Sequence, residues 1–131
     1  MNPLVSRWLR LANEDLRMAE RALQDEIFRQ VCFHAQQAVE KALKGLLVAR
    51  VGTHIKGHSL EQLLLSDPGV GSELAMWRPA LRKLDQFYLP TRYADVVPTE
   101  AAEPTRADAE SALQDATAFG ADIRSKLDRE R

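Results

Sequence analysis

Few residues of this 131-residue chain have the types and spacing that catalysis or metal binding requires. His54 and His58 are four residues apart, as helical zinc ligands are, but a lysine–glycine pair between them breaks the helix. Cys32 and His34 fall on a predicted helix where their side chains diverge, and Cys32 lies in an apolar stripe. We therefore expect no metal ion, no cofactor and no catalytic residue among them.

The binding candidates lie in a proline-containing segment, residues 89–104. It contains Arg92, Tyr93 and Asp95 within four positions, and loops of this length in compact domains are usually functional or disordered. The planar guanidinium of Arg92 would bind a phosphate, Tyr93 would stack or hydrogen-bond, and Asp95 would orient Arg92. Alternatively, the three side chains form an ion-pair cluster that holds the loop. His58 is a fourth candidate for the same pocket.

The charge is nearly balanced over the whole chain but not along it. The sequence contains 18 basic and 19 acidic residues, a formal net charge of -1, which excludes a strongly basic nucleic-acid clamp. Residues 1–58 hold 9 basic and 6 acidic residues, and residues 59–131 hold 9 and 13. A local phosphate site on the first half is therefore compatible with the total, although a solvated face of mixed ion pairs also explains it.

The single cysteine, the absence of a leader-like start and the absence of a long apolar run predict a cytoplasmic protein with no membrane partner.

The elements that must position these residues are helices. Ala and Leu number 36, against 16 for Val, Ile and Thr, and this bias favours helix over strand. Apolar spacing and capping signals predict helices that begin near residues 3, 28, 59, 74 and 105, the third of them short. Asn2-Pro3 and Thr105 mark the starts of the first and last helices, Gly52 marks the end of the second, and Asp67-Pro68-Gly69 ends the third. Pro79 either kinks the fourth helix or begins it after a separate turn. The chain is thus predicted to be one all-α domain, 1–131, an up-down bundle of four main helices plus one short helix.

The second predicted helix, 28–51, has one broad apolar face and a polar face that includes Gln37, Glu40, Lys41 and Lys44. Phe33 and Val48 fall on the polar side, where they would contribute nothing to the core of their own chain. We therefore expect a partner surface there, in a homodimer. For Gln36, Gln37, Glu40 and Lys44, hydrogen bonds within the helix or at the dimer face are favoured over ligand binding.

The segment CFHAQQAVEKALK, residues 32–44, resembles the signature helix of the HEPN family, the higher-eukaryote and prokaryote nucleotide-binding domains. Further matching features are Trp8, Asp15-Leu16, the Gly57-His58-Ser59-Leu60 run and the TRYAD run at residues 91–95. They follow in the family's order over nearly the whole chain.

The resemblance implies a small helical bundle that homodimerises and pairs with a minimal nucleotidyltransferase, in modules of the toxin–antitoxin type. Many members are metal-independent ribonucleases that use an Arg and a His four to six residues apart. Here no His follows Arg92, so the expectation is a non-catalytic dimeric partner that binds a nucleotide or RNA. Two alternatives are a ribonuclease in which His58 or Tyr93 replaces the missing His, and a purely structural adaptor.

Overall fold

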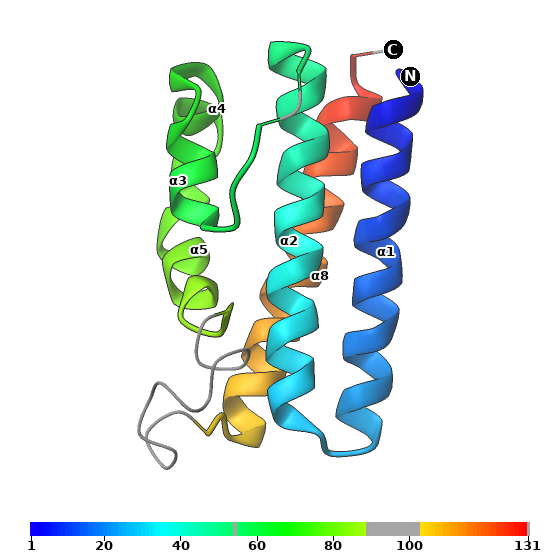
Figure 1. Cartoon of the computed structure of the whole chain (residues 1–131), viewed down its shortest axis with the longest axis vertical. Coiled ribbons are helices and arrows are strands. Elements are labelled where there is room, and N and C mark those ends of the chain that lie inside the picture. The colour runs from blue at the N-terminus through cyan, green and yellow to red at the C-terminus, as the bar shows by residue number, and fades with distance from the viewer. Residues whose placement is uncertain (54, 89–102, 131) are drawn as a thin grey trace.

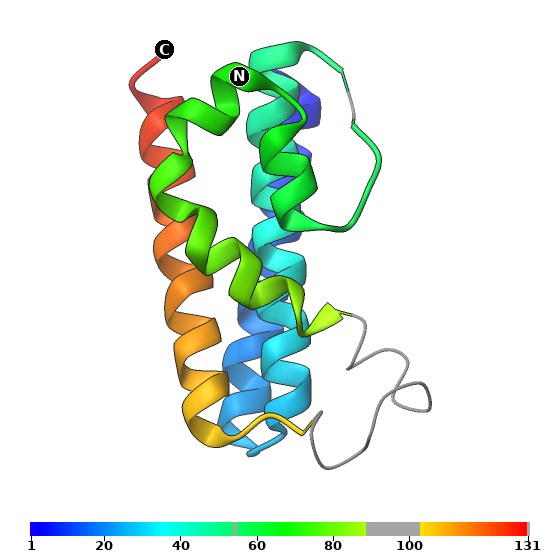
Figure 2. The same ribbon diagram turned by 90° about the vertical axis from the view of Figure 1, so that its left-hand side faces the viewer.

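The computed structural model describes residues 1–53, 55–88 and 103–130, and within these ranges every regular element is a helix. The fold class expected from the sequence is therefore confirmed. Three long helices stand side by side, and a layer of shorter helices covers one flank (Figures 1 and 2). The two ends of the chain lie at the same end of the bundle (Figure 1).

Local capping signals determine where the long helices begin and end. Helix α1 spans Pro3–Gln24, and the Asn2 side chain accepts a hydrogen bond from the Leu4 backbone N–H at 2.8 Å. Helix α2 spans Phe28–Val51 and ends at Gly52, whose φ of 89° is the left-handed conformation that favours glycine. Helix α8 spans Arg106–Asp128 and begins with a capping box between Thr105 and Asp108.

The layer of shorter helices contains one helix that the sequence did not predict. Helix α3 (Leu60–Leu65) is followed by α4 (Pro68–Glu73), a 3-10 turn η1 (Ala75–Trp77) and α5 (Arg78–Asp85). The Asp67-Pro68 pair, expected only to end the third helix, also begins α4, because Asp67 accepts a hydrogen bond from the Val70 N–H at 3.0 Å. Pro79 then lies in the first turn of α5, where proline is tolerated.

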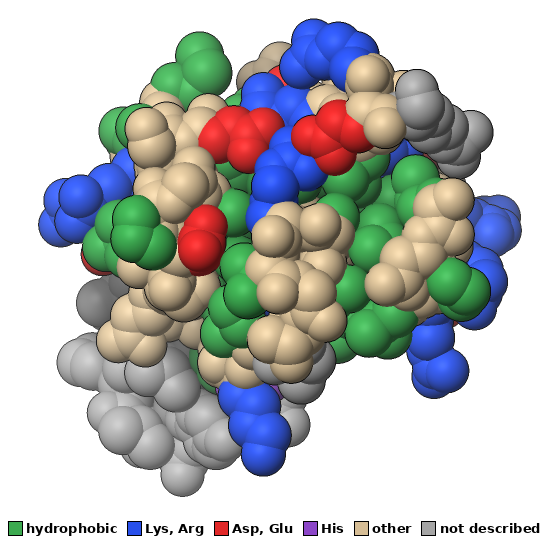
Figure 3. Space-filling view, turned by 90° about the horizontal axis from the view of Figure 1, so that it is seen from above, with side chains coloured by type: hydrophobic (Ala, Val, Ile, Leu, Met, Phe, Trp, Pro, Cys, Tyr) green, Lys and Arg blue, Asp and Glu red, His purple; other side chains and the backbone are tan. Residues whose placement is uncertain are grey.

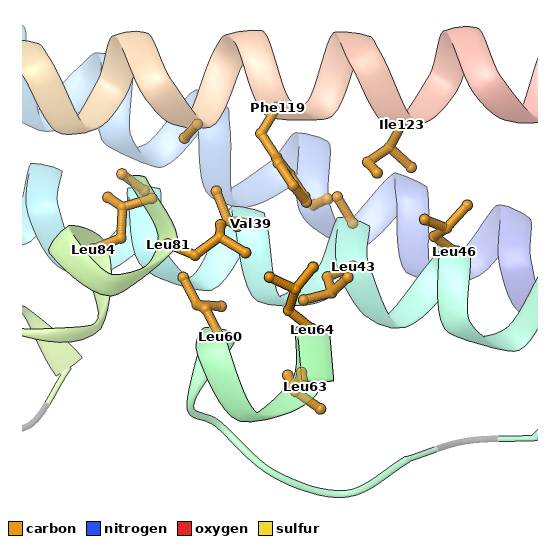
Figure 4. Packing of buried hydrophobic residues seen from close by; sticks show 14 of the residues in the cluster. Val39, Leu43, Leu46, Leu60, Leu63, Leu64, Leu81, Leu84, Phe119 and Ile123 are labelled. Atoms are coloured by element: carbon orange, nitrogen blue, oxygen red, sulfur yellow. The ribbon is translucent and has the colours of Figure 1, made fainter. Parts of the chain in front are cut away.

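Helix α2 is the central element, because α1 and α8 pack on one side of it and α3 and α5 on the other. Figure 4 shows Leu81 of α5 and Leu64 of α3 meeting Val39 and Leu43 of α2, opposite Phe119 of α8. Seven consecutive residues of α2, 42–48, are buried. The expectation that Val48 is exposed is therefore wrong: only 2% of its surface is accessible.

Ion pairs join three segments of the chain at the end of the bundle that holds both termini. Arg50 of α2 binds Glu73 of α4 at 2.9 Å and Glu130 at 2.6 Å. Figure 3 looks onto this end, where acidic and basic side chains adjoin among hydrophobic ones. None of the described helices is long and apolar enough to cross a membrane.

Candidate functional site

One edge of α2 holds a chain of buried polar groups that ends at His58. Glu40 is 3% exposed and Lys44 is 6% exposed, and Lys44 Nζ donates to Glu40 Oε2 at 3.1 Å. The Nδ1 atom of His58 lies 3.2 and 3.3 Å from the two Glu40 oxygens. Because a carboxylate only accepts hydrogen bonds, Nδ1 is the nitrogen of His58 that carries the proton. Fully buried Gln36 donates to the His58 carbonyl at 3.0 Å, and this bond ties the loop to the helix.

Aromatic rings cover this network at the surface. The ring of His58 stacks on Tyr88 with centroids 5.2 Å apart and an angle of 11° between the planes. Phe33 of α2 stacks on the same tyrosine at 6.4 Å. The His58 side chain is 59% exposed, and a shallow pocket of about 350 Å³ is lined by His58, Ser59, Asp85 and Tyr88. Stacked, partly exposed rings of this kind are platforms for planar ligands.

Asp85, the last residue of α5, holds the loop in place. Its carboxylate accepts from the Ser59 hydroxyl at 3.1 Å and from the backbone N–H groups of Leu60 and Glu61 at 2.7 and 3.1 Å. These N–H groups belong to the first turn of α3, which has no partners of its own for them. Asp85 thereby positions His58, which directly precedes the capping residue Ser59.

A second polar cluster lies between α1 and α2. Asp15 Oδ1 is 2.8 Å from His34 Nδ1, and Asp15 Oδ2 pairs with Lys41 Nζ. Burial raises the pKa of Asp15. The hydrogen bonds from His34 and Lys41, together with the charges of these two residues, lower it by more than burial raises it, so the pKa lies below its ordinary value. Sequence reasoning missed this cluster. The signal was available: an acidic residue inside the apolar stripe of the first helix, opposite a His and a Lys seven positions apart on one face.

Cys32 is fully buried, as expected from its place in the apolar stripe. Burial, with a smaller contribution from Asp108, raises the pKa of its thiol to about 12. Its thiolate is therefore scarce at neutral pH, and a buried thiol in this state is a poor nucleophile.

Of the residues singled out in the sequence, the structure brings together His58, Phe33, Gln36, Glu40 and Lys44. Lys41 belongs instead to the Asp15 cluster.

Gln37 donates a hydrogen bond to Gln36 at 2.8 Å. The polar face of α2 is less exposed than expected, since Gln36, Glu40 and Lys44 are all buried. Arg92, Tyr93 and Asp95 lie outside the described residues, as does His54, so a pocket shared by His58 and Arg92 stays a prediction. Tyr88 and Asp85 were not singled out, because their roles depend on a helix docking beside His58.

The model of the HEPN domain family matches residues 5–125, which is most of the chain. This protein belongs to the HEPN family. Among solved structures, the HEPN chain is similar to TT1696 from Thermus thermophilus, with 39% identity and a TM-score of 0.85 over 96% of this chain and 99% of that one. It is also similar to ST0689, an archaeal HEPN homologue, with 31% identity and a TM-score of 0.75 over 94% and 97% of the two chains. No curated protein matches.

Proposed function

We propose that this HEPN protein is a non-catalytic, dimeric partner of a minimal nucleotidyltransferase and binds a nucleotide or RNA at the His58–Tyr88 surface. The observation that supports ligand binding is the stack of the His58 ring on the Tyr88 ring, with centroids 5.2 Å apart, beside an open pocket. A nucleobase adds to such a stack by its own flat face, whichever base it is.

Arg92 would provide the phosphate contact. It follows Tyr88 by four residues in the sequence. Its planar guanidinium is suited to bind the phosphate of a ligand whose base lies on the ring stack. Tyr93 and Asp95 remain the residues proposed to stack beside it and to orient it.

Calorimetry with AMP, ATP and a short single-stranded RNA tests ligand binding. We expect His58→Ala to weaken binding about 5- to 100-fold, the range that one base stack contributes. His58→Phe keeps the ring and should retain most of the affinity. Arg92→Ala should also weaken binding, while Arg129→Ala, an exposed arginine elsewhere, should not. Wild-type protein that binds none of the three probes would exclude this part of the proposal.

The dimer and the nucleotidyltransferase partner are proposed from HEPN membership and from Phe33. Phe33 is half-buried and contacts only the surface rings of His34 and Tyr88 among the ring contacts described, so a second copy can cover it. Light scattering should give a dimer that Phe33→Glu converts to monomer. Co-purification with a nucleotidyltransferase encoded beside this gene tests the partner. A monomeric wild type, or a neighbour of another class, would contradict these points. A Phe33-dependent dimer that binds no nucleotide, RNA or nucleotidyltransferase would instead indicate the structural adaptor.

One observation favours a ribonuclease as the second candidate. Glu40 holds the protonated Nδ1 of His58, which leaves Nε2 as the acceptor that a general base needs. Labelled RNA incubated with the protein and EDTA tests this directly. Cleavage that disappears in both His58→Ala and Arg92→Ala would establish the enzyme, and intact RNA would exclude it.

A further inference from the structure

The outer side of α1 carries a stripe of arginines. Helix α1 packs against α2 and α8 and stands at one edge of the bundle (Figure 1). Its four arginines are all exposed and fall within an arc of about 80° around the helix: Arg7, Arg10, Arg17 and Arg21. Among the residues that the structure describes, none of the four forms an ion pair, whereas every other arginine except Arg129 is bonded to an oxygen of the chain. The charges of α1 are therefore available to a partner.

An apolar seam runs beside the arginine stripe. Leu4, Leu11 and Met18 recur every seven residues, which is about two helical turns. Leu4 is 41% exposed, Met18 is 53% exposed, and Leu11 is partly buried. A seven-residue apolar repeat with charges along its edge is typical of a helix that pairs with a second helix.

The same face is hollowed where a second helix would insert side chains. A hollow of about 330 Å³ is lined by Glu14, Arg17, Met18 and Arg21, which are residues i, i+3, i+4 and i+7 of α1. Residues at this spacing surround one point of a helix surface, and four of them form the hole that receives a side chain in coiled-coil packing. A hollow of about 180 Å³ adjoins it, and its α1 residues, 18, 21, 22 and 25, repeat the spacing.

The charge of this face indicates the kind of helix that fits it. Within the arc of the stripe, four arginines accompany one acidic residue, Glu14, a net charge of +3. With Asp25, which lines the smaller hollow, the sum is still positive. Glu20 lies about 60° outside the arc. It is on the flank toward α8, seven residues after Asn13, which bonds Arg124 of that helix.

We propose that the exposed face of α1 is a docking surface for an acidic amphipathic helix of another protein. Apolar side chains of that helix pack on the seam and enter the two hollows, and its Asp or Glu side chains pair with the arginines. A guanidinium can bind a carboxylate by two parallel N–H···O bonds, which fixes the direction of docking. A second copy of this chain is a poor occupant, because a two-fold contact puts the same patch on both sides and so brings arginine against arginine. The surface goes beyond the proposed function, since it needs neither a nucleotide nor a dimer.

Two synthetic helical peptides test the surface on the full chain. Both are about three heptads long with leucine at the two apolar positions, and the flanking positions hold glutamate in peptide E and lysine in peptide K. The methyl signals of Leu4, Leu11 and Met18 in nuclear magnetic resonance report binding. We expect peptide E to shift these signals saturably, more weakly in about 1 M salt, and peptide K to bind at least about tenfold less tightly. Peptide E that moves none of the three signals, or peptide K that binds as tightly, would overturn the proposal.

Two other polyanions are run against the same methyl signals. Vesicles of anionic phospholipid and a polyuridine RNA offer negative charge without a helix that fits the hollows. Both should move the three signals less than peptide E does at equal charge concentration. A stronger response to the vesicles would assign the face to a membrane surface, and a stronger response to the RNA would assign it to nucleic acid. Either result would overturn the proposal.

Charge exchange provides the matched control. Arg10→Glu/Arg17→Glu should lose at least about tenfold in affinity for peptide E and gain affinity for peptide K, because the flank of the seam changes sign. Arg129→Glu changes an unpaired, exposed arginine that follows α8, and it should bind peptide E as the wild type does. Thermal unfolding checks that the variants fold alike. An equal loss in both variants, or no gain for peptide K, would overturn the proposal. His58→Ala and Phe33→Glu should leave peptide binding unchanged, so failure of the proposed function would not affect this result.

Discussion

At the scale of single residues, the notable feature is a pair of charged side chains, Glu40 and Lys44, that are buried within the bundle. Glu40 and Lys44 lie one turn apart on α2 and are almost completely buried. Lys44 also lies over the ring of Trp8, 5.4 Å from its centroid. A buried ion pair is weak evidence of net stability, since desolvation offsets attraction, but removal of one partner leaves the other charge uncompensated.

Lys44→Met should therefore lower the free energy of unfolding by about 3–5 kcal/mol, because among the described residues it leaves buried Glu40 with His58 as its remaining partner. The double variant Glu40→Met/Lys44→Met should recover most of that loss, since neither charge remains. Urea denaturation measures both. A double variant no more stable than Lys44→Met alone would contradict the account.

Asp15 should make stability depend on pH. Its pKa is depressed in the folded protein, so its contribution is fully present above the unfolded value of about 4 and disappears as the pH falls through the folded pKa. Compared with Asp15→Asn, the wild type should be more stable at pH 6, and the difference should shrink steadily below pH 4. Glu20→Gln, an exposed acid on the same helix, is the control and should show no such trend. A difference that is constant from pH 6 to pH 3 would rule this out.

At the scale of helices, two buried glycines mark different kinds of contact. A Cβ on Gly45 of α2 would lie 3.3 Å from Trp8 Cβ, an atom bonded directly to the α1 backbone, and 3.5 Å from the terminal Cδ2 of Leu9. A Cβ on Gly120 of α8 would instead meet the end of the flexible Arg124 side chain at 3.2 Å. Of these two glycines, Gly45 is therefore the one at which packing requires the absence of a side chain.

Gly120→Ala should raise the free energy of unfolding by up to about 1 kcal/mol, because alanine favours helix and Arg124 can move aside. Gly45→Ala gains the same propensity but forces α1 away, at a cost of about 1–3 kcal/mol, so it should be less stable than the wild type. Thermal and urea unfolding of both variants provide the comparison. The opposite order of stability would refute the contact at Gly45.

At the scale of the whole molecule, Arg50 connects three parts of the chain that are distant in sequence. It joins the end of α2 to Glu73 of α4 and to Glu130 after α8. The hydrogen bond from Arg50 lowers the pKa of Glu73, although partial burial opposes the shift. One partly exposed guanidinium thus links α2, the α4 helix of the outer layer and the residues after α8 at one end of the bundle.

Arg50→Met should reduce the free energy of unfolding by about 1 kcal/mol at low salt, the upper end for a partly exposed pair. The loss should be smaller in about 1 M NaCl, because salt screens such interactions. Arg82→Met, in which the replaced side chain is 68% exposed, should stay within about 0.5 kcal/mol of the wild type. A loss for Arg50→Met that salt does not change would indicate packing rather than charge.

The sequence alone determined the features that depend on neighbours a few residues away. Asn2-Pro3, Gly52 and Thr105 predicted where α1 begins, where α2 ends and where α8 begins, because a cap bonds to N–H or C=O groups within four residues. The buried position of Cys32 also followed from the apolar spacing of its helix, and the HEPN family was indicated by the resemblance of residues 32–44 to the family's signature helix.

Only the tertiary structure decided which side of each helix is covered. Val48 and Glu40 lie on what the period marks as a polar face, yet both are buried. Val48 lines a hollow together with Val5 of α1 and Leu127 of α8, whereas Glu40 bonds Lys44 and the His58 ring. In the same way, the pairing of Asp15 with His34 and the stacking of Tyr88 on His58 required the fold. Each joins side chains 19 or more residues apart, and helical periodicity carries no information about which helices will meet.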